Sequence, residues 1–594
     1  MTESLEMKTV FALALTAGMA LVAGGGEKVD PRVRTFVEPV RIVWLSANTD
    51  QSSVTNADVL LTPRFGQVSE GRFLSPRCGC TLENKGKPAS IVFDFGRELH
   101  GGVAIGQGTV HDAKVRVRFG ESVGEAMAER GEKGAQADHS ARDDVHELPW
   151  LGTTEIGNTG FRFVRIDLVT PGKATLESVR AVSLMRPMTR LGEFRCSDER
   201  VTRIWETACR TVHLCAQDYL WDGIKRDRLV WMGDMHPEIC SLLAAFGAVS
   251  VIPESLDYLR RTTPVGSYPN NMGTYAYWYI CGFREWWYYT GDLKWLRAQQ
   301  GYLRDTLVFL SKAERADGYN TLYGLLDWPT HGNRAAEEDG RQALRVMAFR
   351  AGQEMAEALG DEELAALCRD TVERAKRPRV DPRGENSAAA VMALAGLRSP
   401  REMYETVIGR NGIAKFSTFY GFYMLEAMSA AGEDAAALGI LRDYWGGMLD
   451  MGATSFWEDF DVSWTNGVTR IDELPVAGRK DIHGDFGKYC YIGYRHSLCH
   501  GWSSGPAAWL SRHVLGVERL APGGAKVRIR PALGDLAWAE GAVPLAKGVL
   551  HVRHERRADG TVRTVVKAPI GVEIEGDVEI SRSSPAQITR GREP

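Results

Sequence analysis

The sequence predicts a multidomain protein in which an (α/α)6 toroid of six helical hairpins is flanked by N-terminal and C-terminal β-sandwich domains. The chain has 594 residues. That length exceeds the roughly 250–300 residues that one hydrophobic core can serve. Polar and apolar residues alternate in short segments at both ends, whereas the middle carries a long series of helical periodicities.

The N-terminal sandwich is predicted over residues 28–190. Segments 114–119 and 161–166 alternate polar and apolar side chains, and Gly and Pro residues separate such segments. The C-terminal sandwich is predicted over 517–594, where an Asp-Gly turn signal at 559–560 joins two alternating runs. Short alternating strands with turn signals are typical of β-sandwiches.

The toroid is predicted over residues 191–516. A Ser cap and acidic residues open its first helical pattern, and about twelve helices joined by short connections follow. One of them is predicted over 238–248. Interval 453–504 is rich in Gly and aromatic residues and lacks clear periodicity. Long irregular intervals in compact domains are usually functional.

The charge balance excludes several classes of partner. The chain has 72 Lys and Arg against 76 Asp and Glu, a net charge of −4. No large positive surface for nucleic acid or an anionic membrane is therefore expected.

Residues 1–23 are predicted to be a signal peptide. Their apolar run, 10–22, has about 13 residues, which suits a signal peptide and is too short to cross a bilayer. The sequence therefore predicts a secreted or periplasmic protein.

The ten cysteines do not suggest a disulfide framework. Five of them fall inside helical patterns, where a free cysteine behaves as a small apolar residue: Cys209, Cys215, Cys240, Cys281 and Cys368. Cys78 and Cys80 lack the spacing of a zinc site. Neither a metal nor a cofactor is expected, and one or two disulfides stay open.

The densest polar cluster runs from Asp222 to Glu238, between two predicted helices. It holds several carboxylates, two arginines flanking an Asp, and Trp231. Acids that bind hydroxyls, arginines that orient the acids and a ring that stacks on a sugar would make a ligand pocket. A surface ion-pair network is the alternative interpretation.

A second cluster, 454–464, lies in the irregular interval and places Glu458 among aromatic residues. Partial desolvation there would favour general acid–base work, whereas an exposed Glu is the simpler alternative. Two carboxylate clusters at one end of a toroid match glycoside hydrolysis, which needs two carboxyl groups across one bond. Trp328 and His500 are weaker candidates for the same pocket.

Several motifs resemble those of the bacterial α-L-rhamnosidases of glycoside hydrolase family 78. TSFWEDFD at 454–461 is similar to the family motif TxxWExWD, and SLCHGWSSGPAAWL at 497–510 is also similar to the family. The resemblance covers most of the chain after the signal segment. It implies an inverting enzyme with a six-hairpin catalytic toroid between β-sandwiches, and it implies that Glu458 is the general base.

The first motif departs from the family. The family pattern is DCPxRDERxGWxGD, whereas this chain reads DGIKRDRLVWMGD at 222–234 and lacks the Glu of the general acid. Alignment from the right-hand end places Asp227 at that position, so Asp227 is the predicted acid, with Glu238 as the fallback. The predicted substrate-binding residues are Asp222, Arg226, Trp231, Asp234, Glu238, Trp328 and His500.

The sequence thus predicts an exported inverting glycosidase that removes terminal α-L-rhamnosyl units from oligo- or polysaccharides. The expected partner is a rhamnose-containing glycan or glycoside, with no nucleic acid and no membrane. Because the acid motif departs from the family, one alternative is a carbohydrate-binding protein that has lost turnover. Another is a related toroid enzyme with a different sugar specificity or an eliminative mechanism.

Overall fold

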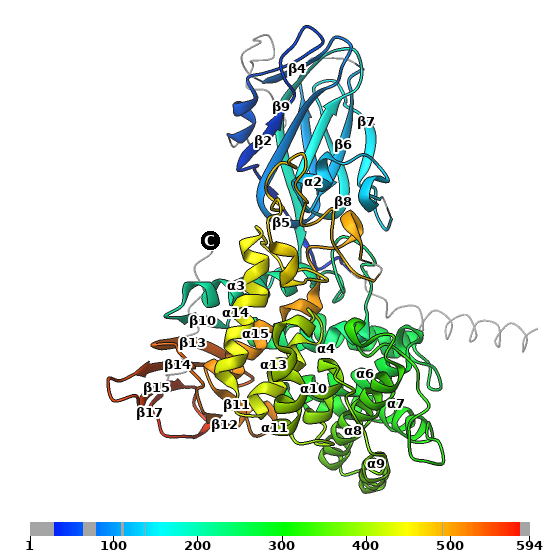
Figure 1. Ribbon diagram of the computed structural model, residues 1–594, viewed down its shortest axis with the longest axis vertical. Helices are drawn as coiled ribbons and strands as arrows, with labels where there is room; N and C mark the ends of the chain where they lie inside the picture. Colours follow the sequence, from blue (N-terminus) through cyan, green and yellow to red (C-terminus); the bar gives the residue numbers. More distant parts are fainter. Residues whose placement is uncertain (1–28, 63–78, 109–111, 137, 490, 583–594) are drawn as a thin grey trace, which may run out of the picture.

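The computed structural model describes residues 29–62, 79–108, 112–136, 138–489 and 491–582 (Figure 1). The predicted signal peptide and Cys78 lie outside these ranges. Among the described helices, none combines the length and the apolar character that crossing a membrane requires.

The N-terminal domain is a nine-stranded sheet that stands on one end of the toroid in Figure 1. Its strand order is β3-β4-β9-β5-β8-β6-β7, with β1 paired to β9 and β2 paired to β5. The strands are β1 (Val33–Val37), β2 (Arg41–Leu45), β3 (Ser52–Thr55), β4 (Cys80–Asn84), β5 (Ala89–Gln107), β6 (Lys114–Gly120), β7 (Asp143–Glu147), β8 (Thr153–Leu168) and β9 (Gly172–Met185). A short helix, α2 (Val123–Met127), follows β6.

The toroid begins at α3 and supplies most of the helices. They are α3 (Glu199–Cys215), α4 (Met232–Ala245), α5 (Val251–Thr262), α6 (Gly273–Thr290), α7 (Leu293–Ser311), α8 (Arg334–Leu359), α9 (Glu362–Ala375), α10 (Asn386–Leu394), α11 (Pro400–Met403), α12 (Gly409–Asn411), α13 (Gly421–Ala430), α14 (Asp434–Asp450) and α15 (Pro506–Trp509). The predicted toroid between β-rich domains is confirmed.

The start of α4 was predicted wrongly. The helix begins at Met232 rather than at 238, so Asp234 and Glu238 lie on its first two turns and not in a loop. Pro237 suggested a helix start because proline lacks the N–H that a helix interior uses. The helix accommodates Pro237 in its sixth position.

The irregular interval 453–504 rises from the toroid to lie beside α2 and β8 of the N-terminal domain (Figure 1). It contains only short 3-10 turns and bridges among its described residues. Leu474 of this interval packs against Val123, Ala126 and Phe163 of the N-terminal domain, and the polar contacts between the two are described below.

The C-terminal domain has a five-stranded sheet, β10-β13-β14-β15-β17, and a three-stranded sheet, β11-β12-β16. The strands are β10 (Glu193–Cys196), β11 (Val517–Arg519), β12 (Lys526–Ile529), β13 (Trp538–Leu545), β14 (Gly548–Arg556), β15 (Val562–Ala568), β16 (Glu573–Glu575) and β17 (Glu579–Arg582). Strand β10, from the segment assigned to the toroid by sequence, pairs with β13. The toroid and this domain share one hydrophobic core, whereas the N-terminal domain has its own.

The cysteine prediction is confirmed. All eight described cysteines are free and buried, and the five predicted on helices lie on α3, α4, α6 and α9. They pack as small apolar side chains.

Candidate active site

The loop between α3 and α4 is closed on itself by Asp222 and Leu229. The Asp222 backbone N–H donates to the Leu229 carbonyl at 3.0 Å, and the Leu229 N–H donates to Asp222 Oδ1 at 2.8 Å. Within this loop Asp227 and Arg228 have φ values of 52° and 55°. Two consecutive left-handed residues with side chains are strained, and such strain gathers at functional sites.

His500 lies at the centre of the site and joins the loop to the second cluster. His500 pairs with Gly223 in an isolated β-bridge, and the backbone N–H of His500 donates to the Phe456 carbonyl at 2.9 Å. Its Nε2 lies 3.4 Å from Glu458 Oε1 and 3.7 Å from Asp222 Oδ2, and Nδ1 lies 3.8 Å from Asp234 Oδ1. Three predicted acids therefore surround one imidazole.

Glu458 is held by both its backbone and its carboxylate. The Ser497 N–H donates to Oε2 at 3.2 Å, and the Glu458 N–H donates to the Ser497 carbonyl at 3.0 Å. The indole of Trp502 donates to the Glu458 carbonyl at 3.0 Å. Oε1 accepts a short hydrogen bond from Arg226 Nη2. The carboxylate is thus oriented before any ligand arrives.

Arg226 links the two predicted catalytic carboxylates. Its Nη2 contacts Glu458, its Nη1 lies 3.6 Å from Asp227 Oδ1, and its guanidinium lies 4.8 Å from the centre of the Tyr491 ring. Glu458 is buried, whereas the Asp227 side chain is 28% exposed. One carboxylate therefore lies deep in the site and the other lies at its mouth.

Burial disfavours the charged forms of three other ionisable groups in the site. Burial, with Asp234 as a neighbour, raises the pKa of Asp222 well above its ordinary value. Burial likewise raises the pKa of Asp234 well above its ordinary value and lowers that of His500 well below its own. Burial therefore favours the uncharged form of all three groups. A neutral carboxyl can both donate and accept a hydrogen bond, as recognition of sugar hydroxyls requires.

His500 Nδ1 and Arg226 Nε are among the buried polar atoms of the site that have no hydrogen-bond partner within the described chain. Buried polar groups are normally satisfied. These two atoms are therefore ones that a polar ligand would engage.

Aromatic rings form one side of the site. Trp328 donates from Nε1 to the Tyr491 hydroxyl at 2.8 Å and stacks on Tyr489 with ring centres 5.3 Å apart. Trp231 meets Tyr275 edge to face at 6.1 Å. Both tryptophans are half-buried. Trp457, by contrast, is 1% exposed and belongs to the core.

Glu238 lies one helical turn beyond Asp234, beneath the chain at Gly501. Its side chain is fully buried and neither carboxyl oxygen has a hydrogen-bond partner within the described residues. A Cβ on Gly501 would lie 1.7 Å from Glu238 Oε1, so only glycine fits there. The structure places Glu238 behind His500 rather than beside Asp227.

Two family models match the chain. The bacterial α-L-rhamnosidase six-hairpin glycosidase domain matches residues 189–377, and the bacterial α-L-rhamnosidase C-terminal domain matches residues 516–592. Over these two regions the chain is therefore similar to bacterial α-L-rhamnosidases. No curated protein sequence matches it significantly.

Several solved rhamnosidases share the fold of this chain. The GH78 rhamnosidase of Bacillus sp. GL1 is 20% identical, with a TM-score of 0.69 over 83% of this chain and 54% of its own. The α-L-rhamnosidase of Dictyoglumus thermophilum is 19% identical, with a TM-score of 0.67 over 82% and 56%. The chain therefore spans about half the length of these two. A rhamnosidase from Klebsiella oxytoca with rhamnose bound is 19% identical, with a TM-score of 0.64 over 81% and 96%.

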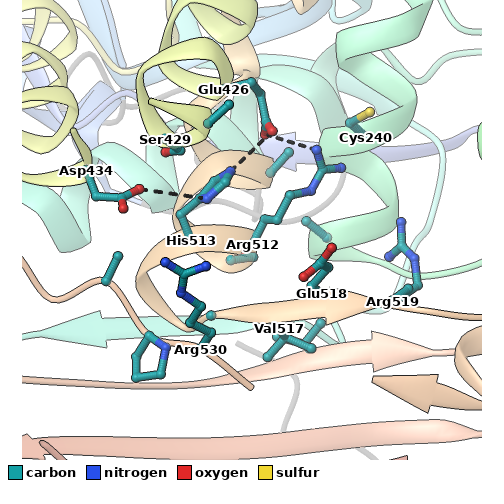
Figure 2. Close-up of a pocket in the computed structure, with 18 of the residues that line it drawn as sticks. Cys240, Glu426, Ser429, Asp434, Arg512, His513, Val517, Glu518, Arg519 and Arg530 are labelled. Atoms are coloured by element: carbon teal, nitrogen blue, oxygen red, sulfur yellow. Dashed lines mark hydrogen bonds and ion pairs between the residues drawn. The ribbon is translucent and has the colours of Figure 1, made fainter. Parts of the chain in front are cut away.

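A cavity of about 810 Å³ lies elsewhere in the chain, between the toroid and the C-terminal domain (Figure 2). Ala244 lines it, about 15 Å along α4 from Asp234. Figure 2 shows Glu426 bound by Arg512 and His513, with Arg512 Nη1 at 3.0 Å from Oε1. None of the predicted site residues lines this cavity.

Sequence reasoning missed several residues of the site. His139 of the N-terminal domain lies 3.4 Å from Asp227 Oδ1, Tyr491 covers Arg226, and Lys225 is buried behind the loop. Lys225 lies within the first motif, so the sequence did contain a local signal for this residue. His139 lies far from both motifs along the chain, and only the domain arrangement brings it to Asp227.

Replacing Glu238 by Gln is expected to flatten the pH dependence of stability. Burial raises the pKa of Glu238 well above the ordinary 4.5, so the native state keeps a proton that the unfolded chain loses. Stability is then greatest below the unfolded pKa and falls as pH rises toward the folded pKa, by about 1.4 kcal/mol per pH unit. Glu238→Gln, which has the same shape and no charge, should gain stability relative to the parent as the pH rises above the ordinary 4.5 of a glutamic acid.

Urea unfolding at several pH values checks this expectation. Glu147→Gln, at an exposed position of β7, is the control and should follow the parent protein. If Glu238→Gln also follows the parent over the whole range, Glu238 is not protonated in the native state.

Proposed function

We propose that this chain is an inverting glycoside hydrolase that removes terminal α-L-rhamnosyl units from oligo- or polysaccharides outside the cytoplasm. The observation that carries the proposal is the pair of carboxylates, Glu458 and Asp227, on two nitrogens of one guanidinium. The match of residues 189–377 to the bacterial α-L-rhamnosidase six-hairpin glycosidase domain supports it. So does the Klebsiella oxytoca rhamnosidase of the same fold, whose structure contains rhamnose.

In the proposed reaction Glu458 takes a proton from water, which attacks the anomeric carbon. Asp227 gives its proton to the glycosidic oxygen as that bond breaks, so each turnover ends with Glu458 protonated and Asp227 ionised. Solvent exchange then restores both. A water must fit beside the sugar, so inverting enzymes hold the two carboxyl groups roughly 6.5–9.5 Å apart. The Arg226 guanidinium between Glu458 and Asp227 supports this wider spacing.

Buried polar groups account for sugar recognition. Burial favours the uncharged forms of Asp222, Asp234 and His500, and these forms would offer donors and acceptors to ring hydroxyls without the cost of burying additional charges. Trp328 and Trp231 offer ring faces for the apolar side of the sugar. A 6-deoxy sugar such as rhamnose, which carries a methyl group, suits an aromatic wall.

Release of rhamnose from aryl α-L-rhamnosides and from rhamnosylated glycan panels tests the proposal. The parent protein should release rhamnose, and Asp227→Asn and Glu458→Gln should both lose most of that activity. Product mass separates hydrolysis from elimination, because a lyase adds no water. Binding of rhamnosides without release would favour the second candidate function, a carbohydrate-binding protein that has lost turnover. The absence of the family's Glu from the first motif supports this candidate.

The extracytoplasmic location rests on the sequence of residues 1–23. Mass spectrometry of the protein recovered from the periplasm or medium should find an N-terminus close to residue 24. An intact N-terminus in the cytoplasmic fraction would contradict the location.

A further inference from the structure

Two buried carboxylates of the N-terminal domain contact the segments that carry the proposed catalytic residues. Glu121 follows β6 and Glu125 lies on α2, and their side chains are 0% and 3% exposed. They are close together, because the Glu121 N–H donates to Glu125 Oε2 at 2.8 Å. Neither residue belongs to the toroid or to either sequence motif.

Both carboxylates bind Lys225, which precedes Arg226 and Asp227 in the loop. Lys225 Nζ lies 2.8 Å from Glu125 Oε1 and 3.3 Å from Glu121 Oε2. The same ammonium donates to the carbonyls of Tyr494 at 2.6 Å and His496 at 2.9 Å. The ammonium is therefore fully engaged by the N-terminal domain and by the segment after Glu458.

Glu121 also holds the segment that orients the proposed base. Its Oε2 accepts from the Leu498 N–H at 2.7 Å, and its Oε1 accepts from the Ser497 hydroxyl at 3.4 Å. The Ser497 N–H in turn donates to Glu458 Oε2 at 3.2 Å. One carboxylate of the N-terminal domain thus contacts both the acid loop and the segment beside the base.

Glu125 completes the cluster through Arg142 and His483. Arg142 Nη2 lies 2.9 Å from Glu125 Oε1. Ser122 Oγ lies 2.8 Å from His483 Nδ1, whose Nε2 lies 2.9 Å from the His496 carbonyl oxygen. Glu121, Glu125 and His483 could surround a metal ion. Lys225 and Arg142 already balance both acids, so a further cation would meet repulsion.

The loop and the N-terminal domain also approach closely. A Cβ on Gly160 of β8 would lie 2.8 Å from Ile224 Cγ1 and 3.1 Å from the Lys225 nitrogen. On the other side of Asp227, Arg228 Nη1 donates to the Asn158 carbonyl at 2.8 Å. The loop that carries Arg226 and Asp227 is therefore anchored on both flanks to the same domain.

We infer that Glu121 and Glu125 are positioning residues that hold the Lys225 loop and segment 496–498 so that Asp227 and Glu458 face each other. The N-terminal domain then helps to set the geometry of the active site. Glu121 and Glu125 act through Lys225 and Ser497 and do not touch the sugar. The expected effect on kcat rests on the proposed function. The expected effect on the positions of the loop and the segment rests on the contacts alone.

The test compares Glu121→Gln and Glu125→Gln with Glu129→Gln in the full chain. Glu129 is a matched control, because it pairs with Arg116 and Arg118 of the same domain but its side chain is 64% exposed. With an aryl rhamnoside, kcat should fall on the order of 10- to 100-fold in the first two variants, because small displacements of catalytic groups are costly. KM should change less than kcat, because Asp234 on α4 and Trp328 lie outside the two segments that Glu121 and Glu125 hold. Glu129→Gln should match the parent.

Hydrogen exchange of peptides covering 222–231 and 494–500 gives a second reading that needs no activity. Exchange there should rise in Glu121→Gln and Glu125→Gln and stay unchanged in Glu129→Gln. If the parent protein does not release rhamnose, the proposed function fails, but this exchange pattern still tests the positioning.

Parent-like kcat and parent-like exchange in both variants would overturn the inference, as would a loss of thermal stability with unchanged kcat in the folded protein. If either Gln variant does not fold, Glu121→Asp replaces it. That change keeps the charge and withdraws the carboxylate by one methylene, and it should also lower kcat.

Discussion

Replacing Glu458 by Gln is expected to lower kcat about 10³- to 10⁴-fold, the range that general acid–base groups contribute. The amide keeps the size of the side chain and can still meet Arg226, Ser497 and His500, but it cannot take a proton from water. KM for an aryl rhamnoside should change little, because Glu458 acts on the attacking water rather than on the bound sugar. Steady-state kinetics measures both constants.

The control for this variant is Glu473→Gln. Glu473 lies in the same irregular interval, is exposed and accepts a hydrogen bond only from the nearby Arg470 N–H within the described residues. It should retain the parent activity. If Glu458→Gln keeps more than about a tenth of the parent kcat, Glu458 is not the general base.

Replacing Asp227 by Asn should produce a defect that depends on the leaving group. An acid that protonates the glycosidic oxygen matters most when the departing alcohol is a poor leaving group. For an alkyl rhamnoside or a disaccharide, kcat/KM should fall about 10²- to 10³-fold. For a dinitrophenyl rhamnoside, whose leaving group needs no proton, it should fall only a few-fold.

Asp222→Asn and Asp234→Asn are the matched comparisons, because both carboxyls are near Asp227 but are buried, and burial raises the pKa of each. Because we propose that Asp222 and Asp234 bind the sugar, the loss of kcat/KM in their variants should be similar for all leaving groups. If the leaving-group dependence instead follows Asp222, the assignment of Asp227 as the acid is wrong.

The fold and the base could be predicted from the sequence, because both have local signals. Alternation of side chains and helical periodicity identify strands and helices without any knowledge of the partners they pack on. Glu458 lies in a motif of eight consecutive residues, 454–461, which resembles the family directly. The backbone and side-chain contacts of Glu458 are consistent with that prediction.

Other features depend on contacts between distant segments. His139, Glu121 and Glu125 reach the site only because the N-terminal sheet stands on the end of the toroid, and no short-range pattern encodes this placement. Strand β10 joins the C-terminal sheet across more than three hundred residues, pairing at Glu193–Ala542. The early start of α4 was hidden because Pro237 disfavours a helix interior and only tertiary packing overrides it.

The anomeric form of the first sugar released tests the central claim most directly. Proton NMR of the hydrolysis of an α-L-rhamnoside, followed from the first minutes, separates the newly formed anomer from the mixture that mutarotation produces later. Direct attack by a water that Glu458 activates should release β-L-rhamnose first. Initial release of α-L-rhamnose would show a covalent intermediate and two closely spaced carboxyl groups, and would contradict the roles given to Glu458 and Asp227.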